Sequence, residues 1–241
     1  MSDRPQILVA LDGSPAGLAT LAAASQIAAR QGWALTCLFV EDEGLLHLCD
    51  YSFVRAVSPL TAAVHELERR RMELGFRRQA AQLEQAVASA TQEAGVPWRF
   101  QVVRGQVTRE LLAAAATVRL IAAGVVGGSP GKRIGGTAQA LLEHAGRPVL
   151  LQGQRRPPPS GQRFLKQPEG ATVISTGSAA SHRAMQLATE LFGHQVTVIA
   201  VLPGLAPAAL HRQITGAAQL LLPLELAAWL ASATAPVIVV P

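Results

Sequence analysis

Short apolar runs alternate with helix-forming segments along most of this chain, and this alternation restricts the fold more than any other feature. Five such runs occur before residue 153: Ile7–Leu11, Leu35–Val40, Trp98–Val102, Val118–Ala123 and Val149–Gln152. Strand–helix alternation predicts a parallel sheet with helices on both faces. Because crossovers between parallel strands are right-handed, we expect a doubly wound, open, five-stranded α/β fold. Hydrophobic residues make up 49% of the chain and charged residues 15%, which suits a large core and argues against disorder.

Cap residues and glycines indicate where the helices between these runs begin and end. Ser14 and Pro15 form an N-cap followed by a favoured first helical residue, and the same pair recurs at Ser58 and Pro59. The expected helices span residues 15 to about 32, 59 to 95, 107 to 117 and 137 to 145. The second is unusually long, and its apolar stripe shifts near Gly75, which predicts a kink or break there.

The pattern restarts near residue 171, which predicts a second, smaller unit. Residues 1–152 form the first domain, the proline-rich stretch 153–170 reads as a linker, and 171–241 echo the first domain. "TGSAASHRAMQLA" matches "LDGSPAGLATLAA" at an offset of 164 residues, and "APVIVV" matches "RPVLLQ" at an offset of 88. The second unit is therefore expected to be a truncated copy with three strands. The alternative is chance similarity between short α/β patterns.

Composition excludes several classes of function and location. The net charge is +5, but the arginines alternate with glutamates and no aromatic residues lie among them, so we expect no nucleic-acid binding. Residues 217–240 are apolar but contain two prolines, so we expect a buried helix followed by a buried strand rather than a membrane span. Two cysteines without metal spacing and no apparent secretory signal make the cytoplasm the expected location.

Two loops follow strands at the edge where doubly wound sheets bind ligands. Asp12-Gly13-Ser14 follows the first strand, and the glycine-rich residues 124–137 follow the fourth. Neither a Walker A loop nor a dinucleotide GxGxxG fits these residues. Glycine amides at a helix start can nevertheless form an anion nest, with Thr137 as the helix cap and Lys132 adding positive charge. The alternative is a solvent-exposed turn whose glycines serve geometry alone.

The glycine spacing and several flanking motifs resemble the universal stress protein family. Gly124-x2-Gly127-x8-Gly136-Thr137 resembles the family's nucleotide loop, G-x2-G-x9-G-[S/T]. VALDGSP at residues 9–15 and Arg147-Pro148-Val149-Leu150 resemble the family's first and last strands. The resemblance covers about residues 5–152 and, more weakly, 171–241. It implies an adenine nucleotide α-hydrolase-like fold that binds ATP, with Mg²⁺ as a possible companion.

The resemblance also assigns a site and a mode of association. It places the nucleotide against the residues Leu11, Asp12, Gly13, Val40, Gly124, Gly127, Lys132, Gly136 and Thr137. Asp12 would lie beside the adenine or ribose, or else would only stabilise its turn. The last strands, PVLLQ and PVIVV, would pair within one chain or between the chains of a homodimer.

Three departures from the family pattern keep a second function open. The glycine spacer has 8 residues instead of 9, Val125 and Val126 stand where polar residues are usual, and Arg119 replaces an aspartate. The first hypothesis is an ATP-binding stress-response module without rapid catalysis. The alternative is a scaffold for protein interactions that binds no nucleotide.

Enzymatic chemistry finds little support in the residues. The six histidines are scattered, and no catalytic triad order occurs. The SGGxDS-type loop of the related hydrolases is absent from the turn after the first strand. Residues 41–43, Glu-Asp-Glu, could hold Mg²⁺ or form a solvated loop. We therefore expect a binding protein rather than an enzyme.

Overall fold

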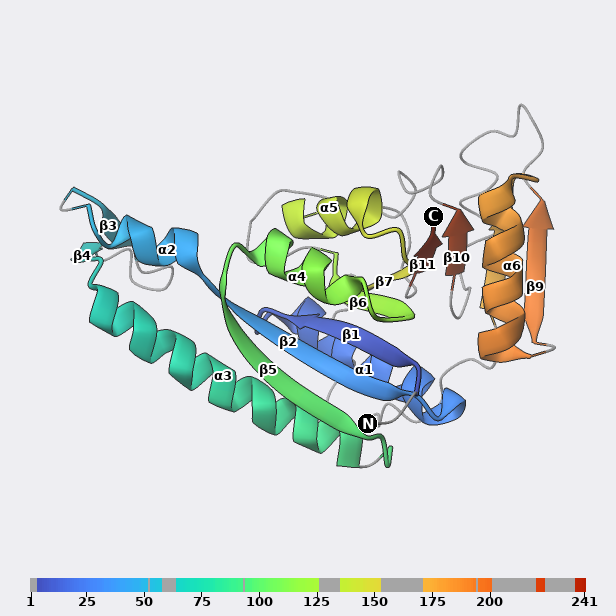
Figure 1. Cartoon of the computed structure of the whole chain (residues 1–241), viewed down its shortest axis with the longest axis horizontal. Coiled ribbons are helices and arrows are strands. Elements are labelled where there is room, and N and C mark those ends of the chain that lie inside the picture. Colours follow the sequence, from blue (N-terminus) through green and yellow to red (C-terminus); the bar gives the residue numbers. More distant parts are fainter. Residues whose placement is uncertain are drawn as a thin grey trace.

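The computed structural model describes residues 4–51, 53–57, 64–92, 94–125, 135–152, 171–193, 195–200, 220–223 and 237–241. Its main feature is one nine-stranded sheet in the order β5-β2-β1-β6-β7-β11-β10-β8-β9 (Figure 1). The first five strands in this order belong to the N-terminal half and are mutually parallel. Their bounds are β1 (Gln6–Leu11), β2 (Ala34–Asp42), β5 (Trp98–Gly105), β6 (Leu120–Gly124) and β7 (Val149–Gln152). The predicted doubly wound α/β fold is confirmed.

Helices cover both faces of the N-terminal part of this sheet. The helices are α1 (Pro15–Gln31), α2 (Glu43–Leu48), α3 (Arg69–Gln92), α4 (Val107–Ala115) and α5 (Gly136–His144). Side chains of α1 and α3 pack with one face of β1 and β2 in one buried cluster. Side chains of α4 and α5 pack with the opposite face in a second cluster. The alternation of strand side chains between these two clusters explains why the strands are almost continuously apolar.

The long helix expected from Ser58 to Gly95 is wrong in its first part. Residues Arg55–Val57 (β3) and Val64–Glu66 (β4) pair as an antiparallel hairpin, and α3 begins only at Arg69. The helix then runs through Gly75 without interruption. A short helix, α2, begins at Glu43, the last of the acidic residues 41–43 for which a solvated loop was one alternative. The apolar spacing of 3 and 4 residues near Val64 was compatible with a helix, but cross-strand pairing decided the outcome.

The C-terminal half extends the same sheet. It consists of β8 (Ala171–Ser175), α6 (Ala179–Phe192), β9 (Val196–Ala200), β10 (Leu220–Pro223) and β11 (Val237–Val240). The expectation of three strands is wrong, because Leu220–Pro223 forms a fourth strand between β8 and β11. A helix was expected at these residues, and a buried apolar run this short does not distinguish the two. The expected linker, residues 153–170, lies outside the described residues.

The two halves meet through antiparallel pairing of their last strands. Val237, Ile238 and Val239 of β11 lie opposite Leu151, Leu150 and Val149 of β7. The edge of β7 is therefore covered within the chain, which is one of the two arrangements expected for PVLLQ and PVIVV. None of the helices in the described part of the chain combines the length and apolar character that crossing a membrane requires.

Candidate functional site

The turn between β1 and α1 is fixed by hydrogen bonds from both sides. Gly13 has a φ of 75°, a conformation that favours glycine. Asp12 Oδ1 accepts a hydrogen bond from the Ser14 amide (2.9 Å), and Ser14 Oγ caps α1 by accepting from the Gly17 amide (3.0 Å). Gln79 Nε2 of α3 donates to the Asp12 carbonyl oxygen (2.8 Å). The carboxylate of Asp12 thus stabilises its turn.

A backbone hydrogen bond joins the residue after β6 to the residue before α5. The Gly135 amide donates to the Val125 carbonyl oxygen (2.7 Å), which joins the two ends of the connection. Helix α5 starts at Gly136 with Gly135 as its N-cap, so the expectation that Thr137 caps the helix is wrong. Since glycine has no side chain, the N-cap of α5 supplies no side-chain acceptor to the first amides of the helix.

Gly124 and Val125 have packing roles in addition to any contact with a ligand. A Cβ at Gly124 would lie 3.2 Å from Ala16 Cβ and 3.3 Å from the Gly17 nitrogen, so β6 approaches α1 closely here. The side chain of Val125 is buried in the cluster under α4 and α5 and does not line the cavity described next. Gly127 and Lys132 lie in residues 126–134, outside the described residues.

Six of the predicted residues line one cavity of about 460 Å³ where the strand order reverses between β1 and β6. They are Leu11, Asp12, Val40, Gly124, Gly136 and Thr137. The two strand ends, the glycine of β6 and the start of α5 thus converge as the sheet-edge rule predicts. Gly13 lies next to the cavity but is not part of its wall. The volume lies in the range of small-molecule pockets.

The remaining wall comes from residues that the sequence analysis missed. Helix α2 contributes Leu45, α3 contributes Phe76 and Gln79, and α4 contributes Val107 and Leu111. The ring of Phe76 packs edge-on against Phe39 of β2, with centroids 6.2 Å apart. The carboxyl end of β5 leads into α4 at the same sheet edge. The rule that ligands bind at the carboxyl ends of parallel strands could therefore have indicated the α4 residues. The sequence carries no comparable signal for α3, whose place at the site depends on its tertiary contacts.

A second hollow of about 670 Å³ adjoins the first and shares Asp42, Val107, Gly136 and Thr137 with it. Helices α4 and α5 both begin at this hollow, and their N-caps, Gln106 and Gly135, provide no side-chain hydrogen bond. The first amides of such helices carry partial positive charge. The combined space is therefore apolar near Phe76 and polar near the two helix starts, where Asp42, Glu43, His47 and Arg109 also line the second hollow.

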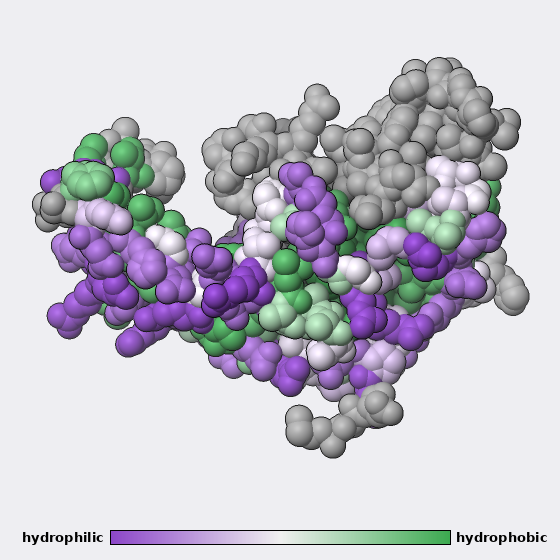
Figure 2. All heavy atoms as spheres, turned by 45° about the horizontal axis from the view of Figure 1, so that its top comes forward, coloured by the Kyte–Doolittle hydropathy of each residue, from purple (hydrophilic) through white to green (hydrophobic). Residues whose placement is uncertain are grey.

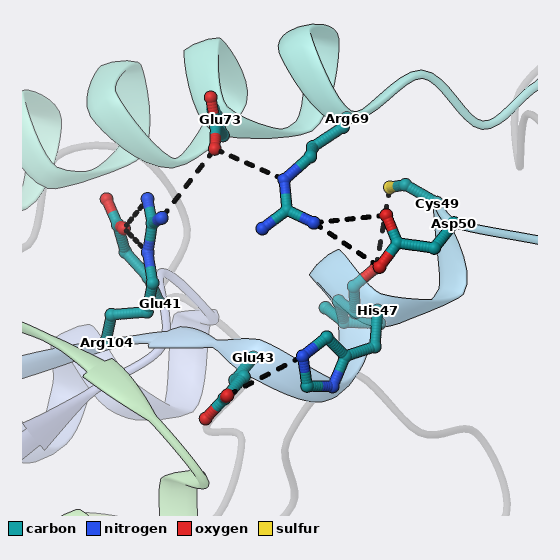
Figure 3. Close-up of polar contacts among 9 residues, drawn as sticks. Glu41, Glu43, His47, Cys49, Asp50, Arg69, Glu73 and Arg104 are labelled. Atoms are coloured by element: carbon teal, nitrogen blue, oxygen red, sulfur yellow. Dashed lines mark hydrogen bonds and ion pairs between the residues drawn. The ribbon is translucent and has the colours of Figure 1, made fainter.

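The acidic residues at the junction of β2 and α2 are engaged with separate partners (Figure 3). Glu41 Oε2 accepts two hydrogen bonds from Arg104 (3.0 and 2.8 Å), which raise the pKa of the arginine above its usual value. Asp42 Oδ1 caps the first turn of α2, and Glu43 lies 3.6 Å from His47 Nε2. Among the described residues, no group of three His, Cys, Asp or Glu side chains could hold a metal ion. The three carboxylates do not converge on one point.

The turn after β8 repeats the backbone of the turn after β1 with different side chains. Gly177 has a φ of 80°, and Ser178 caps α6. Thr176 stands at the position of Asp12, and its amide donates to Ser181 Oγ (2.9 Å). Ser181 is fully buried, and its hydroxyl also contacts those of Thr176 and Ser178 (2.9 and 3.2 Å). These hydroxyls satisfy one another inside the turn.

Comparison with solved structures places the whole chain in one fold. A universal stress protein from Archaeoglobus fulgidus DSM 4304 covers 99% of this chain and 99% of its own length at 14% identity, with a TM-score of 0.64. A functionally unknown protein from Pseudomonas aeruginosa PAO1 covers 99% of this chain and 92% of its own length at 13% identity, with a TM-score of 0.53. No curated protein matches the sequence.

A further solved structure is a universal stress protein in complex with cAMP, which covers 64% of this chain at 18% identity. Its TM-score is 0.45, and a likeness at this level says nothing about what this chain binds. The model of the universal stress protein family matches residues 4–152, from the segment before β1 to the last residue of β7. Since this match spans more than half of the 241 residues, the chain belongs to the universal stress protein family.

Proposed function

We propose that this chain binds an adenine nucleotide, ATP or a close relative, in the cavity between β1, β2 and β6, and that it acts by binding rather than by rapid catalysis. The observation that carries the proposal is the convergence of Asp12, Val40, Gly124 and Thr137 on one cavity of about 460 Å³. These residues come from three strand ends and one helix start, and they occupy the positions at which the family resemblance places the nucleotide.

The character of the two hollows supports a ligand with an apolar and an anionic part. Leu11, Phe76 and Leu111 make one wall apolar, which suits a nucleobase. The starts of α4 and α5 supply amides that are not capped by the side chains of their N-cap residues, and such amides suit phosphate oxygens. Lys132, in the residues outside the described part, would add charge to this end. Any Mg²⁺ would arrive with the phosphates, because Glu41, Asp42 and Glu43 already have other partners.

Calorimetry with Mg²⁺-ATP on the full chain tests the proposal. Thr137→Val removes a hydroxyl at the cavity while keeping the side-chain volume, and Thr117→Val makes the same change at an exposed residue. We expect measurable heat for the wild type, weaker binding for Thr137→Val and unchanged binding for Thr117→Val. Absence of heat with millimolar ATP in the wild type would contradict the proposal. Phosphate release at rates typical of enzymes would contradict the non-catalytic part.

We further propose that residues 171–241 are a reduced copy of the universal stress protein domain. The order β9-β8-β10-β11 corresponds to β2-β1-β6-β7, and counterparts of α3 and β5 are missing from the described C-terminal residues. The antiparallel contact of β7 with β11 gives the halves opposite orientations, as in a two-fold pair. Because the hydroxyls of Thr176, Ser178 and Ser181 occupy the turn, this copy is expected to bind no nucleotide in the same way.

A role as an interaction scaffold remains the second candidate, and one observation favours it. The side chains of Phe53, Val57 and Val64 are mostly exposed on the α2–hairpin region, and the Tyr51 and Phe53 rings pair at 5.6 Å. Figure 2 shows hydrophobic atoms among hydrophilic ones at this end of the molecule. Exposed apolar clusters of this kind occur at interaction sites. Phe53→Ser should then abolish partner binding in cells without altering the nucleotide affinity.

A further inference from the structure

Helix α3 reaches the proposed nucleotide site through one polar side chain. Gln79 lines the cavity, and its Nε2 donates to the carbonyl oxygen of Asp12, 67 residues earlier in the chain (2.8 Å). The approach depends on Gly13, since a Cβ there would lie 2.7 Å from Gln79 Nε2. The hydrogen bond between Gln79 and Asp12 therefore joins the turn after β1 to α3, and both contribute to the wall of the cavity.

A chain of charged contacts holds α3 against the strand ends (Figure 3). Glu73 Oε1 lies 3.7 Å from Arg69 Nε and 3.7 Å from Arg104 Nη1, and Arg104 also binds Glu41 at the end of β2. Arg69 continues the chain to Asp50, which follows α2 (3.1 Å). Each contact is largely exposed and weak alone, but a connected network fixes geometry better than isolated pairs.

The same region of α3 is anchored by apolar packing. Phe76 is buried and packs edge-on against Phe39 in β2. Glu73, Phe76 and Gln79 are three residues apart, so they follow one side of the helix. Sheet contacts at Glu73 and Phe76 thereby determine where the amide of Gln79 lies. Gln79 is thus the end of a rigid path from the sheet to the Asp12 turn.

The Asp12 turn needs such an external restraint. The bonds of Asp12 Oδ1 to the Ser14 amide and of Ser14 Oγ to the Gly17 amide are local and fix the turn only relative to α1. They do not fix its distance from the wall formed by α3. Among the described residues, the hydrogen bond from Gln79 is the side-chain bond that links this turn to a residue distant in the sequence.

We propose that Gln79 is a positioning residue for the nucleotide site, which holds the Asp12 turn at a fixed distance from the α3 wall. This inference rests on the proposed function. A bound nucleoside would occupy the space whose width Gln79 sets, so loss of the hydrogen bond widens the site and weakens binding. The phosphate end, at the starts of α4 and α5, is not touched by Gln79.

The test compares two substitutions of the same kind on the same helix. Gln79→Met keeps the length of the side chain and removes the donor, and Gln85→Met makes the same change at an exposed position of α3. Affinities for Mg²⁺-ATP and for adenosine are measured by calorimetry on the full chain, together with the melting temperatures of the ligand-free proteins. We expect Gln79→Met to weaken the binding of both ligands by the same factor. The factor should be roughly three- to tenfold, because the ligand must then hold in place a turn that the lost hydrogen bond no longer restrains.

Each result bears on the inference. Weaker binding of both ligands in Gln79→Met but not in Gln85→Met, with melting temperatures that differ by no more than one hydrogen bond explains, supports a positioning role. Unchanged affinity in Gln79→Met overturns the inference while leaving nucleotide binding intact. A fall in the melting temperature of Gln79→Met by a few degrees is expected for one lost hydrogen bond, whereas a much larger fall assigns Gln79 a structural role and also overturns the inference. A wild type that binds neither ATP nor adenosine overturns the proposed function and the inference together.

Discussion

Arg119 donates to the carboxylate of Glu190 at 2.6 Å, and its guanidinium lies over the ring of Trp33, 5.6 Å from the centroid. Arg119 precedes β6, whereas Glu190 belongs to α6 of the C-terminal half. Gln31 of α1 also donates to the Leu191 carbonyl oxygen nearby (3.2 Å). The two halves are therefore joined at a second place besides the β7–β11 ladder. The arginine that departs from the family pattern has a structural role in this contact.

A double-mutant cycle should measure the interaction between Arg119 and Glu190 that links the two halves. Both side chains are more than a third exposed, so we expect a coupling energy between Arg119 and Glu190 of only about 0.5–1 kcal/mol. Arg119→Ala alone should cost somewhat more than the coupling, because the contact with Trp33 is also lost. Urea denaturation measures both quantities, and the exposed pair Arg71–Glu68 provides a reference cycle. Coupling no larger than in that reference pair would argue against a joint at Arg119.

The turn after β1 should accept the residues of the turn after β8 when two positions, 12 and 17, are changed together. A Cβ at Gly17 would lie 2.7 Å from Asp12 Oδ1, so Gly17→Ser should displace the carboxylate and cost about 1 kcal/mol. Adding Asp12→Thr reproduces Thr176 and Ser181 of the C-terminal half and should recover most of this loss. The free energies of unfolding of the two single variants and the double variant test this. Additive losses in the double variant would contradict the correspondence between the turns.

Two glycines of the β6–α5 region should respond oppositely to alanine. At Gly124 the added Cβ meets Ala16 Cβ and the backbone of Gly17 at 3.2–3.3 Å, so we expect Gly124→Ala to destabilise the protein by about 1 kcal/mol or more. At Gly136 the Cβ would meet no atom of the described residues within 4 Å, and alanine favours the helix that begins there. Gly136→Ala should therefore be neutral or slightly stabilising. Thermal denaturation of both variants checks the difference, which equal melting temperatures would contradict.

The two cysteines should differ sharply in reactivity. Burial raises the pKa of Cys37 from 9.0 to about 12, whereas Cys49 is partly accessible. A thiol reagent at pH 8 should therefore label Cys49 rapidly and Cys37 only at the rate of unfolding. Since the folded state keeps the Cys37 proton that the unfolded chain loses above about pH 9, this residue should reduce stability as pH rises from 9 towards 12. Cys37→Ala should flatten that dependence, and rapid labelling of Cys37 in the folded protein would contradict the assigned burial.

Local patterns predicted most of the N-terminal architecture because its core strands are short apolar runs between capped helices. The prediction failed where the pattern of apolar residues was compatible with both a helix and a strand. Val64 fits the spacing of the helix that follows, yet it pairs with Val57 in a hairpin. Leu220–Pro223 fits a buried helix as well as a buried strand, and its position between β8 and β11 made it a strand. In both cases a partner distant in the sequence decided the outcome.

The candidate site divides in the same way. The family resemblance predicts Asp12, Val40, Gly124 and Thr137 as site residues. They lie at or just beyond the carboxyl ends of strands or at the start of α5, and these share one edge of the parallel sheet. Phe76 and Gln79 carry no such sign, since they lie in the middle of a helix whose register on the sheet depends on packing.

The sequence by itself determined the doubly wound sheet, the family and the strand ends that border the cavity, because hydrophobic periodicity, caps and glycines act locally. Tertiary structure decided how α3 closes the cavity, how Arg119 meets Glu190 and how β11 covers the edge of β7. These relationships join residues far apart in the chain, and the free energy that selects them comes from burial and pairing in the assembled fold.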